Sequence, residues 1–105
     1  PESLYYLLKY WGKFCKPIYI TEHGLADAGD TNRAWYIQEA VNNIKRTIEE
    51  GVDVRGYFYW SLLDNFEWDK GFWPRFGLVD VDRKTLERKI RPSAWEYKKI
   101  IERGI

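Results

Sequence analysis

The sequence is poor in sulfur and in histidine. Its 105 residues include one cysteine, one histidine and no methionine. With Cys15 alone, no internal disulfide is possible, so we expect a reducing, cytoplasmic compartment and a buried, inert thiol. Because position 1 is not methionine, either an initiator residue was removed or the chain is a piece of something longer. The opening stretch "PESLYYLLKYWGKF" lacks the basic start and small-residue cleavage site of a signal peptide.

Long apolar runs and an excess of charge of one sign are also absent. No stretch approaches the ~20 apolar residues that a membrane helix needs, so no membrane partner is expected. The formal net charge is +1 at pH 7, and charged side chains are interspersed rather than gathered in blocks. Nucleic acid is therefore not an expected partner either. The richness in Glu, Lys and Arg is a feature shared with proteins of thermophiles.

Aromatic residues, by contrast, are abundant. Six tryptophans, eight tyrosines and five phenylalanines make up 18% of the chain. So many rings in a short chain require either a large core or a surface on which a ligand stacks.

The first half of the sequence predicts a helix, a strand and a second helix. Apolar residues at helical spacing predict a helix over 3–14. The apolar run over 18–20 is typical of a strand in a sheet that is covered on both faces. After the turn-rich stretch "GLADAGDTNRA", Asp30 or Thr31 is the expected cap of a helix over 31–50. We expect its apolar side to comprise Trp35, Ile37, Ala40, Val41, Ile44 and Ile48.

The second half continues the alternation and then departs from it. The aromatic run "VRGYFYWSL" predicts a second strand, followed by a long segment over 63–75. "FGLVDVDRKTLERKI" predicts a hairpin that turns at 82–85, and a last helix is expected from Pro92 through 101. Strands that alternate with helices indicate parallel βα units. Two such strands leave open edges and half-covered faces, so the predicted core is incomplete.

Carboxylates and tryptophans gather where the two strands are predicted to end. Glu22 ends the first strand in "PIYITEHG", and Trp60 ends the second. The segment with Glu67 and Trp68 then follows. Functional residues of parallel α/β folds lie at the carboxyl ends of strands. A sugar ring stacks its apolar face on indole, and its hydroxyls bind to a carboxylate. A retaining glycosidase also needs two carboxyls about 5–5.5 Å apart. The combination of carboxylates and tryptophans therefore indicates sugar chemistry.

Two stretches carry a family resemblance. "PIYITEHG" and "GYFYWSLLDNFEWDKGFWPRFGLVDVDRKTLERKIRPSAWEYKKI" resemble the C-terminal part of family 1 of the glycoside hydrolases, the β-glucosidases and related β-glycosidases. The resemblance covers nearly the whole chain. It implies fold class α/β, with residues 1–105 as the C-terminal part of a (β/α)₈ TIM barrel. The implied order is helix 6, strand 7, helix 7, strand 8, an insertion hairpin and helix 8.

The resemblance also implies a role for each matching residue. Glu22 matches the catalytic nucleophile, in the motif usually written T-E-N-G. Trp60 matches the floor of the subsite for the attacked sugar, and Phe76 matches an aromatic that lines the same subsite. Glu67 matches the carboxylate that binds the hydroxyls on the fourth and sixth carbons, and Trp68 matches a donor to a neighbouring hydroxyl. Glu67 followed by Trp68 further resembles members that act on unphosphorylated sugars.

The sequence departs from the family pattern beside the nucleophile. His23 stands where asparagine is usual, and we interpret it as a residue that supports the catalytic side chains, or as a merely structural one, rather than as a direct catalyst. Ala40 stands where many members have histidine, which affects only local packing. Four tryptophans are interpreted as packing residues, with a place at the site entrance as an alternative for Trp73; the four are Trp11, Trp35, Trp73 and Trp95.

The largest departure is an absence. The family's acid/base glutamate lies in a T-x-N-E-P motif on the fourth strand, and this chain has no such motif. An ordinary barrel takes about 250 residues, so the chain is expected to be inactive alone. We expect a larger partner chain to supply the first six strands and the acid/base glutamate. Together they would hydrolyse terminal, non-phosphorylated β-glycosides without a metal or organic cofactor. Whether the split is encoded or proteolytic stays open, as does a higher oligomer.

Two other interpretations stay open. A non-catalytic carbohydrate-binding module would use the same tryptophans as an exposed platform and would be monomeric. A self-associating barrel fragment would instead pair with copies of itself. The preferred sugar, whether glucose, galactose, mannose or fucose, is not indicated, because the loops on the leaving-group side are absent from this sequence.

Overall fold

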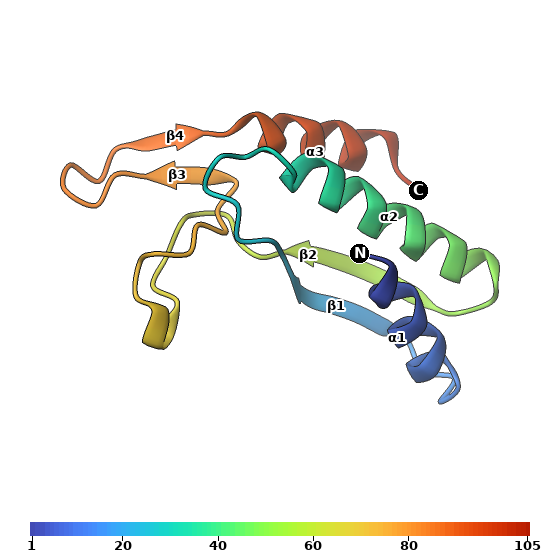
Figure 1. Ribbon diagram of the computed structural model, residues 1–105. Helices are drawn as coiled ribbons and strands as arrows, with labels where there is room; N and C mark the ends of the chain where they lie inside the picture. Colours follow the sequence, from blue (N-terminus) through green and yellow to red (C-terminus); the bar gives the residue numbers. More distant parts are fainter.

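A parallel pair of strands forms the centre of the fold. The computed structural model describes residues 1–105, and in it β1 (Ile18–His23) lies beside β2 (Val54–Tyr59) (Figure 1). Helix α2 (Arg33–Glu49) connects the two strands, so the three elements make one βαβ unit. Parallel strands require such a crossover connection. The predicted parallel arrangement is therefore confirmed.

Three helices cover one face of this sheet. α2 lies between α1 (Glu2–Gly12) and α3 (Pro92–Arg103) (Figure 1). One apolar cluster joins α1, β1 and α2, and its buried members are Leu4, Leu8, Ile20, Ala40 and Ile44. A second cluster joins α2 to β2 and α3, and its buried members are Ile37, Val41, Tyr59, Leu78 and Ile100. None of the helices is both long and apolar enough to cross a lipid bilayer.

The opposite face of the sheet has no cover within the chain. Tyr19 of β1 is 55% exposed, and Phe58 of β2 is 59% exposed. Side chains alternate along a strand, so their neighbours Ile20 and Tyr59 point toward the helices and are buried. Each strand also has only one hydrogen-bonded neighbour. The structure thus confirms that the core of the predicted βα units is incomplete.

A hairpin and a long loop follow β2. The antiparallel strands β3 (Val79–Val81) and β4 (Arg88–Ile90) form the hairpin, which leads directly into α3 (Figure 1). The loop between β2 and β3 contains the short 3₁₀-helix η1 (Trp68–Lys70). In Figure 1 this loop lies beyond the end of β2, away from the helices.

The second helix begins later than predicted, and a different residue caps it. The Asp27 carboxylate accepts hydrogen bonds from the backbone N–H groups of Asn32 and Arg33, at 2.8 and 3.1 Å. Asp30, one of the two predicted caps, instead accepts a hydrogen bond from the Ser93 N–H at 2.9 Å. The prediction was wrong because Asp30 serves the first turn of α3, a partner that local sequence does not reveal.

Several side chains expected to be buried are exposed. Cys15 lies in the turn after α1 with a φ of 52°, and its thiol is exposed rather than buried. Ile48, on the expected apolar side of α2, is 38% exposed. Four tryptophans are between 51% and 82% exposed rather than packed in this chain's core, and they are Trp11, Trp35, Trp73 and Trp95. Helical spacing therefore overestimated the burial of Trp35 and Ile48 of α2 within this chain.

Candidate active site

One open cavity lies at the carboxyl ends of β1 and β2. Its volume is about 610 Å³, and it is lined by Glu22, His23, Gly24, Trp60, Asn65, Phe66, Glu67, Trp68 and Phe76. The structure therefore brings together all six residues that the sequence singled out, while their individual roles stay predictions. Gly24, Asn65 and Phe66 were missed. The signal for the last two was their position immediately before Glu67 in "DNFEW".

An irregularity in strand pairing turns Glu22 toward this cavity. Ile20 pairs with Tyr57, and His23 pairs with Tyr59, so β1 advances from 20 to 23 while β2 advances from 57 to 59. One extra residue in a strand reverses the alternation of the side chains that follow. Ile20 and His23 consequently both lie on the helix side of the sheet. Glu22 is left exposed at the cavity.

The end of β1 holds Trp60 by its backbone. The Trp60 N–H donates a hydrogen bond to the His23 carbonyl oxygen at 2.9 Å. A Cβ atom on Gly24 would overlap the Trp60 carbonyl oxygen, so this close approach requires glycine. The peptide bond between Trp60 and Ser61 is cis. Trp60 is 38% exposed, so its indole is partly open to the cavity.

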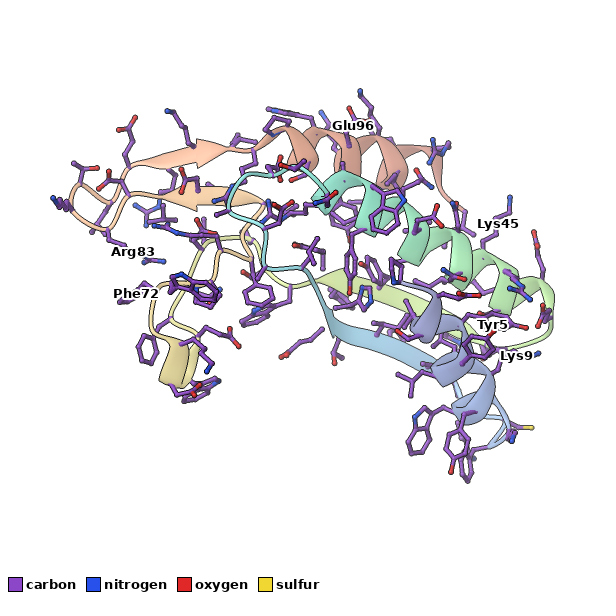
Figure 2. The ribbon with its side chains drawn as sticks, in the orientation of Figure 1. Tyr5, Lys9, Lys45, Phe72, Arg83 and Glu96 are labelled. Carbon is purple, nitrogen blue, oxygen red and sulfur yellow. The ribbon has the colours of Figure 1, made fainter.

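Glu67 and Trp68 lie at the tip of the loop that contains η1. The Glu67 N–H donates to the Gly71 carbonyl oxygen at 2.7 Å, which closes the tip on itself. The Arg83 guanidinium of the hairpin lies 4.2 Å from the centre of the Phe72 ring (Figure 2). This cation–π contact supports the loop from the hairpin side. Trp68 itself is 80% exposed, so its indole is free to contact a ligand.

A buried carboxylate fixes the base of the same loop. Asp64 accepts hydrogen bonds from both terminal nitrogens of Arg91 at 2.9 and 3.0 Å, and from the Gly77 N–H at 2.9 Å. Arg75 donates to it at 3.2 Å. Burial acts to raise the pKa of Asp64, but the hydrogen bonds from Arg91 and Gly77 outweigh burial and lower the pKa to about 2. Asp64 is therefore ionised at neutral pH.

A buried guanidinium joins the loops that follow the two strands. Arg33, the first residue of α2, has no exposed surface. Its Nε donates to the Tyr59 hydroxyl at 3.0 Å, and its Nη2 donates to the carbonyl oxygens of Asp27 and Arg75 at 2.6 and 2.7 Å. It also pairs with Asp30. One side chain thus sets the distance between the loop after β1 and the loop after β2.

Trp73 and Ala40, which the sequence also singled out, lie outside the cavity. Trp73, the alternative entrance residue, is 82% exposed and does not line the cavity. Ala40 is fully buried in the cluster between α1 and α2, so the histidine-to-alanine difference concerns helix packing. The chain also contains no group of three or more His, Cys, Asp or Glu side chains placed to bind a metal ion.

The chain matches known proteins over almost all of its length. The sequence pattern of glycosyl hydrolase family 1 matches residues 1–104. The chain is 48% identical to a β-galactosidase from Sulfolobus acidocaldarius, over 95% of this chain and 21% of that protein. It is 38% identical to β-glucosidase A from Thermotoga maritima, over 97% of this chain and 25% of that protein. A hyperthermophilic β-glucosidase from Pyrococcus furiosus superposes with a TM-score of 0.95 and 46% identity, over 98% of this chain and 22% of that structure.

The chain therefore spans about a fifth to a quarter of the length of these relatives. Identity at this level, together with superposition over 98% of the chain, shows that its βα units correspond to a part of the TIM barrel of these β-glycosidases. The similarity to a hyperthermophilic β-glucosidase is consistent with the richness of this chain in charged residues, a feature of thermophile proteins. The chain belongs to glycosyl hydrolase family 1.

Proposed function

We propose that this chain is the small subunit or a fragment of a retaining β-glycosidase that hydrolyses terminal, non-phosphorylated β-D-glycosides. The observation that carries the proposal is that Glu22 and Glu67 line one cavity with Trp60, in a chain of family 1. The relatives' names, β-galactosidase and β-glucosidase, support the same class of substrate.

Glu22 is the nucleophile in this proposal. One carboxylate oxygen attacks the anomeric carbon while the bond from that carbon to the leaving oxygen breaks, and the acid/base glutamate of the remaining barrel protonates the leaving oxygen. Water then attacks the glycosyl–enzyme, gives a proton to the same glutamate and releases Glu22. Two inversions at one carbon retain its configuration.

The other cavity residues form a sugar seat, which we define as Trp60, Glu67, Trp68 and Phe76. The partly open indole of Trp60 suits the apolar face of a pyranose ring. The Glu67 carboxylate accepts hydrogen bonds from the hydroxyls on the fourth and sixth carbons, and the Trp68 indole N–H donates to a neighbouring hydroxyl. Two carboxylates in one cavity repel a further negative charge, which favours an unphosphorylated sugar over a phosphorylated one.

A larger chain that carries the other six strands would complete the barrel. Support comes from the uncovered face of the sheet, where Tyr19 and Phe58 are exposed, and from the unpaired edges of β1 and β2. Such faces and edges are normally buried in parallel sheets. A free-standing carbohydrate-binding module would not be expected to leave a sheet face and strand edges uncovered, so this alternative is less well supported.

The first test is reconstitution. We expect a mixture of this chain and a chain carrying the first six strands to form a complex of the summed mass and to hydrolyse an aryl β-glycoside, while neither part does so alone. Light scattering measures the mass, and release of the phenol measures the activity. Assembly of this chain with itself only, without activity in the mixture, would instead establish the self-associating fragment.

The second test locates the nucleophile. A 2-deoxy-2-fluoro glycoside with a good leaving group should add one glycosyl unit to this chain, because the fluorine slows breakdown of the covalent intermediate. The Glu22→Gln variant should form no adduct and lose activity by at least about a thousandfold. Glu96→Gln on the outer helix α3 should behave as wild type (Figure 2). An adduct of unchanged yield on Glu22→Gln would refute the assignment.

A further inference from the structure

His23 is the only histidine of the chain, and the proposed mechanism does not use it. The bulge that turns Glu22 toward the cavity sends the His23 ring into the layer between β2 and α2. Two tyrosine hydroxyls meet its two ring nitrogens there. Nε2 lies 2.9 Å from the Tyr36 hydroxyl, and Nδ1 lies 3.1 Å from the Tyr57 hydroxyl.

These contacts leave the His23 ring little freedom. It stacks on the Tyr36 ring, with centroids 4.7 Å apart and planes 13° apart, and its centroid lies 5.8 Å from that of Tyr57. Tyr36 belongs to α2, and Tyr57 belongs to β2. A single half-buried imidazole therefore ties the end of β1 both to the neighbouring strand β2 and to helix α2.

The charge state of the cluster fits these contacts. Burial lowers the pKa of His23, and burial raises the pKa values of Tyr36 and Tyr57. At neutral pH the imidazole is thus neutral and both phenols keep their protons. A neutral imidazole has one donor nitrogen and one acceptor nitrogen, and a hydroxyl satisfies either. The ring's hydrogen-bond partners are these two hydroxyls, and neither is a carboxylate.

The backbone near Glu22 needs such an anchor. Between Ile20 and His23 the pairing of β1 with β2 is interrupted, so Glu22 has no cross-strand partner of its own. The nearest fixed point after Glu22 is His23, whose carbonyl oxygen accepts the Trp60 N–H at 2.9 Å. Any movement of His23 is passed directly to Glu22 through one peptide unit.

We propose that His23 is a positioning residue for Glu22: by bridging the Tyr36 and Tyr57 hydroxyls, it fixes the bulged end of β1 so that the Glu22 carboxylate faces the anomeric carbon. The inference rests on the proposed nucleophilic role of Glu22. His23 acts through the backbone, because both of its ring nitrogens are occupied by the Tyr36 and Tyr57 hydroxyls. Its loss therefore affects how often Glu22 is aligned for attack, more than how tightly the sugar binds.

The test uses the complete enzyme, formed by this chain and the remaining strands, with active sites counted by the fluoro-glycoside adduct. His23→Phe keeps an aromatic ring but removes both hydrogen bonds. Tyr36→Phe removes one hydroxyl and leaves the imidazole in place, which guards against a folding defect in the first variant. We expect kcat per active site to fall about 10- to 100-fold in His23→Phe, and by a smaller factor in Tyr36→Phe. KM should stay within about twofold.

Conservative replacements sharpen the test. In His23→Asn the side-chain amide lies near the position of Nδ1, and in His23→Gln it lies near the position of Nε2, so each keeps one of the two hydrogen bonds. We expect both variants to recover part of the kcat that His23→Phe loses. Tyr6→Phe on the exposed side of α1 is the matched control and should match wild type.

The outcomes separate this inference from the proposed function. If wild type forms the adduct and turns over, but His23→Phe and Tyr36→Phe keep the wild-type kcat per active site, His23 does not position Glu22. A raised KM with unchanged kcat would overturn the inference equally, because that pattern indicates a substrate contact. A wild-type complex that forms no adduct and shows no turnover overturns the proposed function, and the inference with it.

Discussion

The Asp30 carboxylate accepts a hydrogen bond from the Ser93 backbone N–H at 2.9 Å, although the two residues are 63 positions apart in the sequence. The same carboxylate pairs with Arg33. Burial acts to raise the pKa of Asp30, but the bonds from Ser93 and Arg33 outweigh burial and lower the pKa. The loop after β1 is thereby joined to the first turns of both α2 and α3.

Arg33→Lys tests this junction. Lysine keeps the charge but loses the planar fork that serves Tyr59, Asp27 and Arg75 together. We expect the free energy of unfolding of the assembled enzyme to fall by about 2–4 kcal/mol, because buried acceptors lose their donors. Urea unfolding measures the change. The control is Arg55→Lys, an exposed member of a pair with Asp53, and equal effects of the two variants would contradict the prediction.

Gly24→Ala should disable the site with little effect elsewhere. The added Cβ atom would overlap the Trp60 carbonyl oxygen, which forces β1 and Trp60 apart. We expect kcat/KM to fall at least about a hundredfold, since small displacements of reacting groups cost that much. In the matched control, Gly29→Ala, the new Cβ meets only side-chain atoms, 3.1 Å or more away, and activity should be retained. A fully active Gly24→Ala enzyme would show that this close approach is dispensable.

The contribution of Asp64 to the stability of the fold should depend on pH, and the Asp64→Asn variant tests this. The pKa of Asp64 is about 2 in the folded protein and lower than its ordinary value, so its ionised form stabilises the fold above pH 4. That contribution, about 2 kcal/mol, is lost as pH falls from about 4 to 2. At pH 5 the free energy of unfolding of wild type should exceed that of Asp64→Asn. At pH 2 this excess should be smaller by about 2 kcal/mol. A difference that does not change with pH would exclude this role for Asp64.

Glu67→Gln tests the sugar seat. The amide keeps the shape of the carboxylate but loses charge-assisted hydrogen bonds to two hydroxyls, so kcat/KM for an aryl β-glycoside should fall about 10- to 100-fold. With the matching 6-deoxy glycoside, which lacks one of these hydroxyls, the ratio of wild type to variant should be smaller. Equal ratios for the two substrates would show that Glu67 does not bind the hydroxyl on the sixth carbon.

Local patterns were sufficient to predict the order of the main elements and part of the cavity. Helical spacing identified Ile37, Ala40 and Ile44 as buried positions of α2, and they are buried. The rule that parallel strands end at one edge placed Glu22 and Trp60 together, and both line the cavity. These inferences needed only a repeat of a few residues and the direction of the strands.

Contacts between distant segments were not predictable in this way. The bulge between Ile20 and His23 depends on which residues of β2 lie opposite, and no local pattern records that register. Arg33 is a charged residue that follows a polar stretch, a pattern typical of an exposed first turn of a helix. In the structure it is fully buried. Its burial depends on carbonyl groups of Asp27 and Arg75, which only the folded chain brings to one place.

Both buried ion clusters close within the chain itself. The named partners of Arg33, Asp64 and Asp30 all lie between residues 27 and 93. Residues 27–93 therefore contain both clusters complete and can be exchanged as one unit between related enzymes. A chimaera whose crossover lies ahead of residue 27 would receive Arg33, Asp64 and Asp30 from one parent together with all of these partners, so neither cluster would have to be matched across the junction.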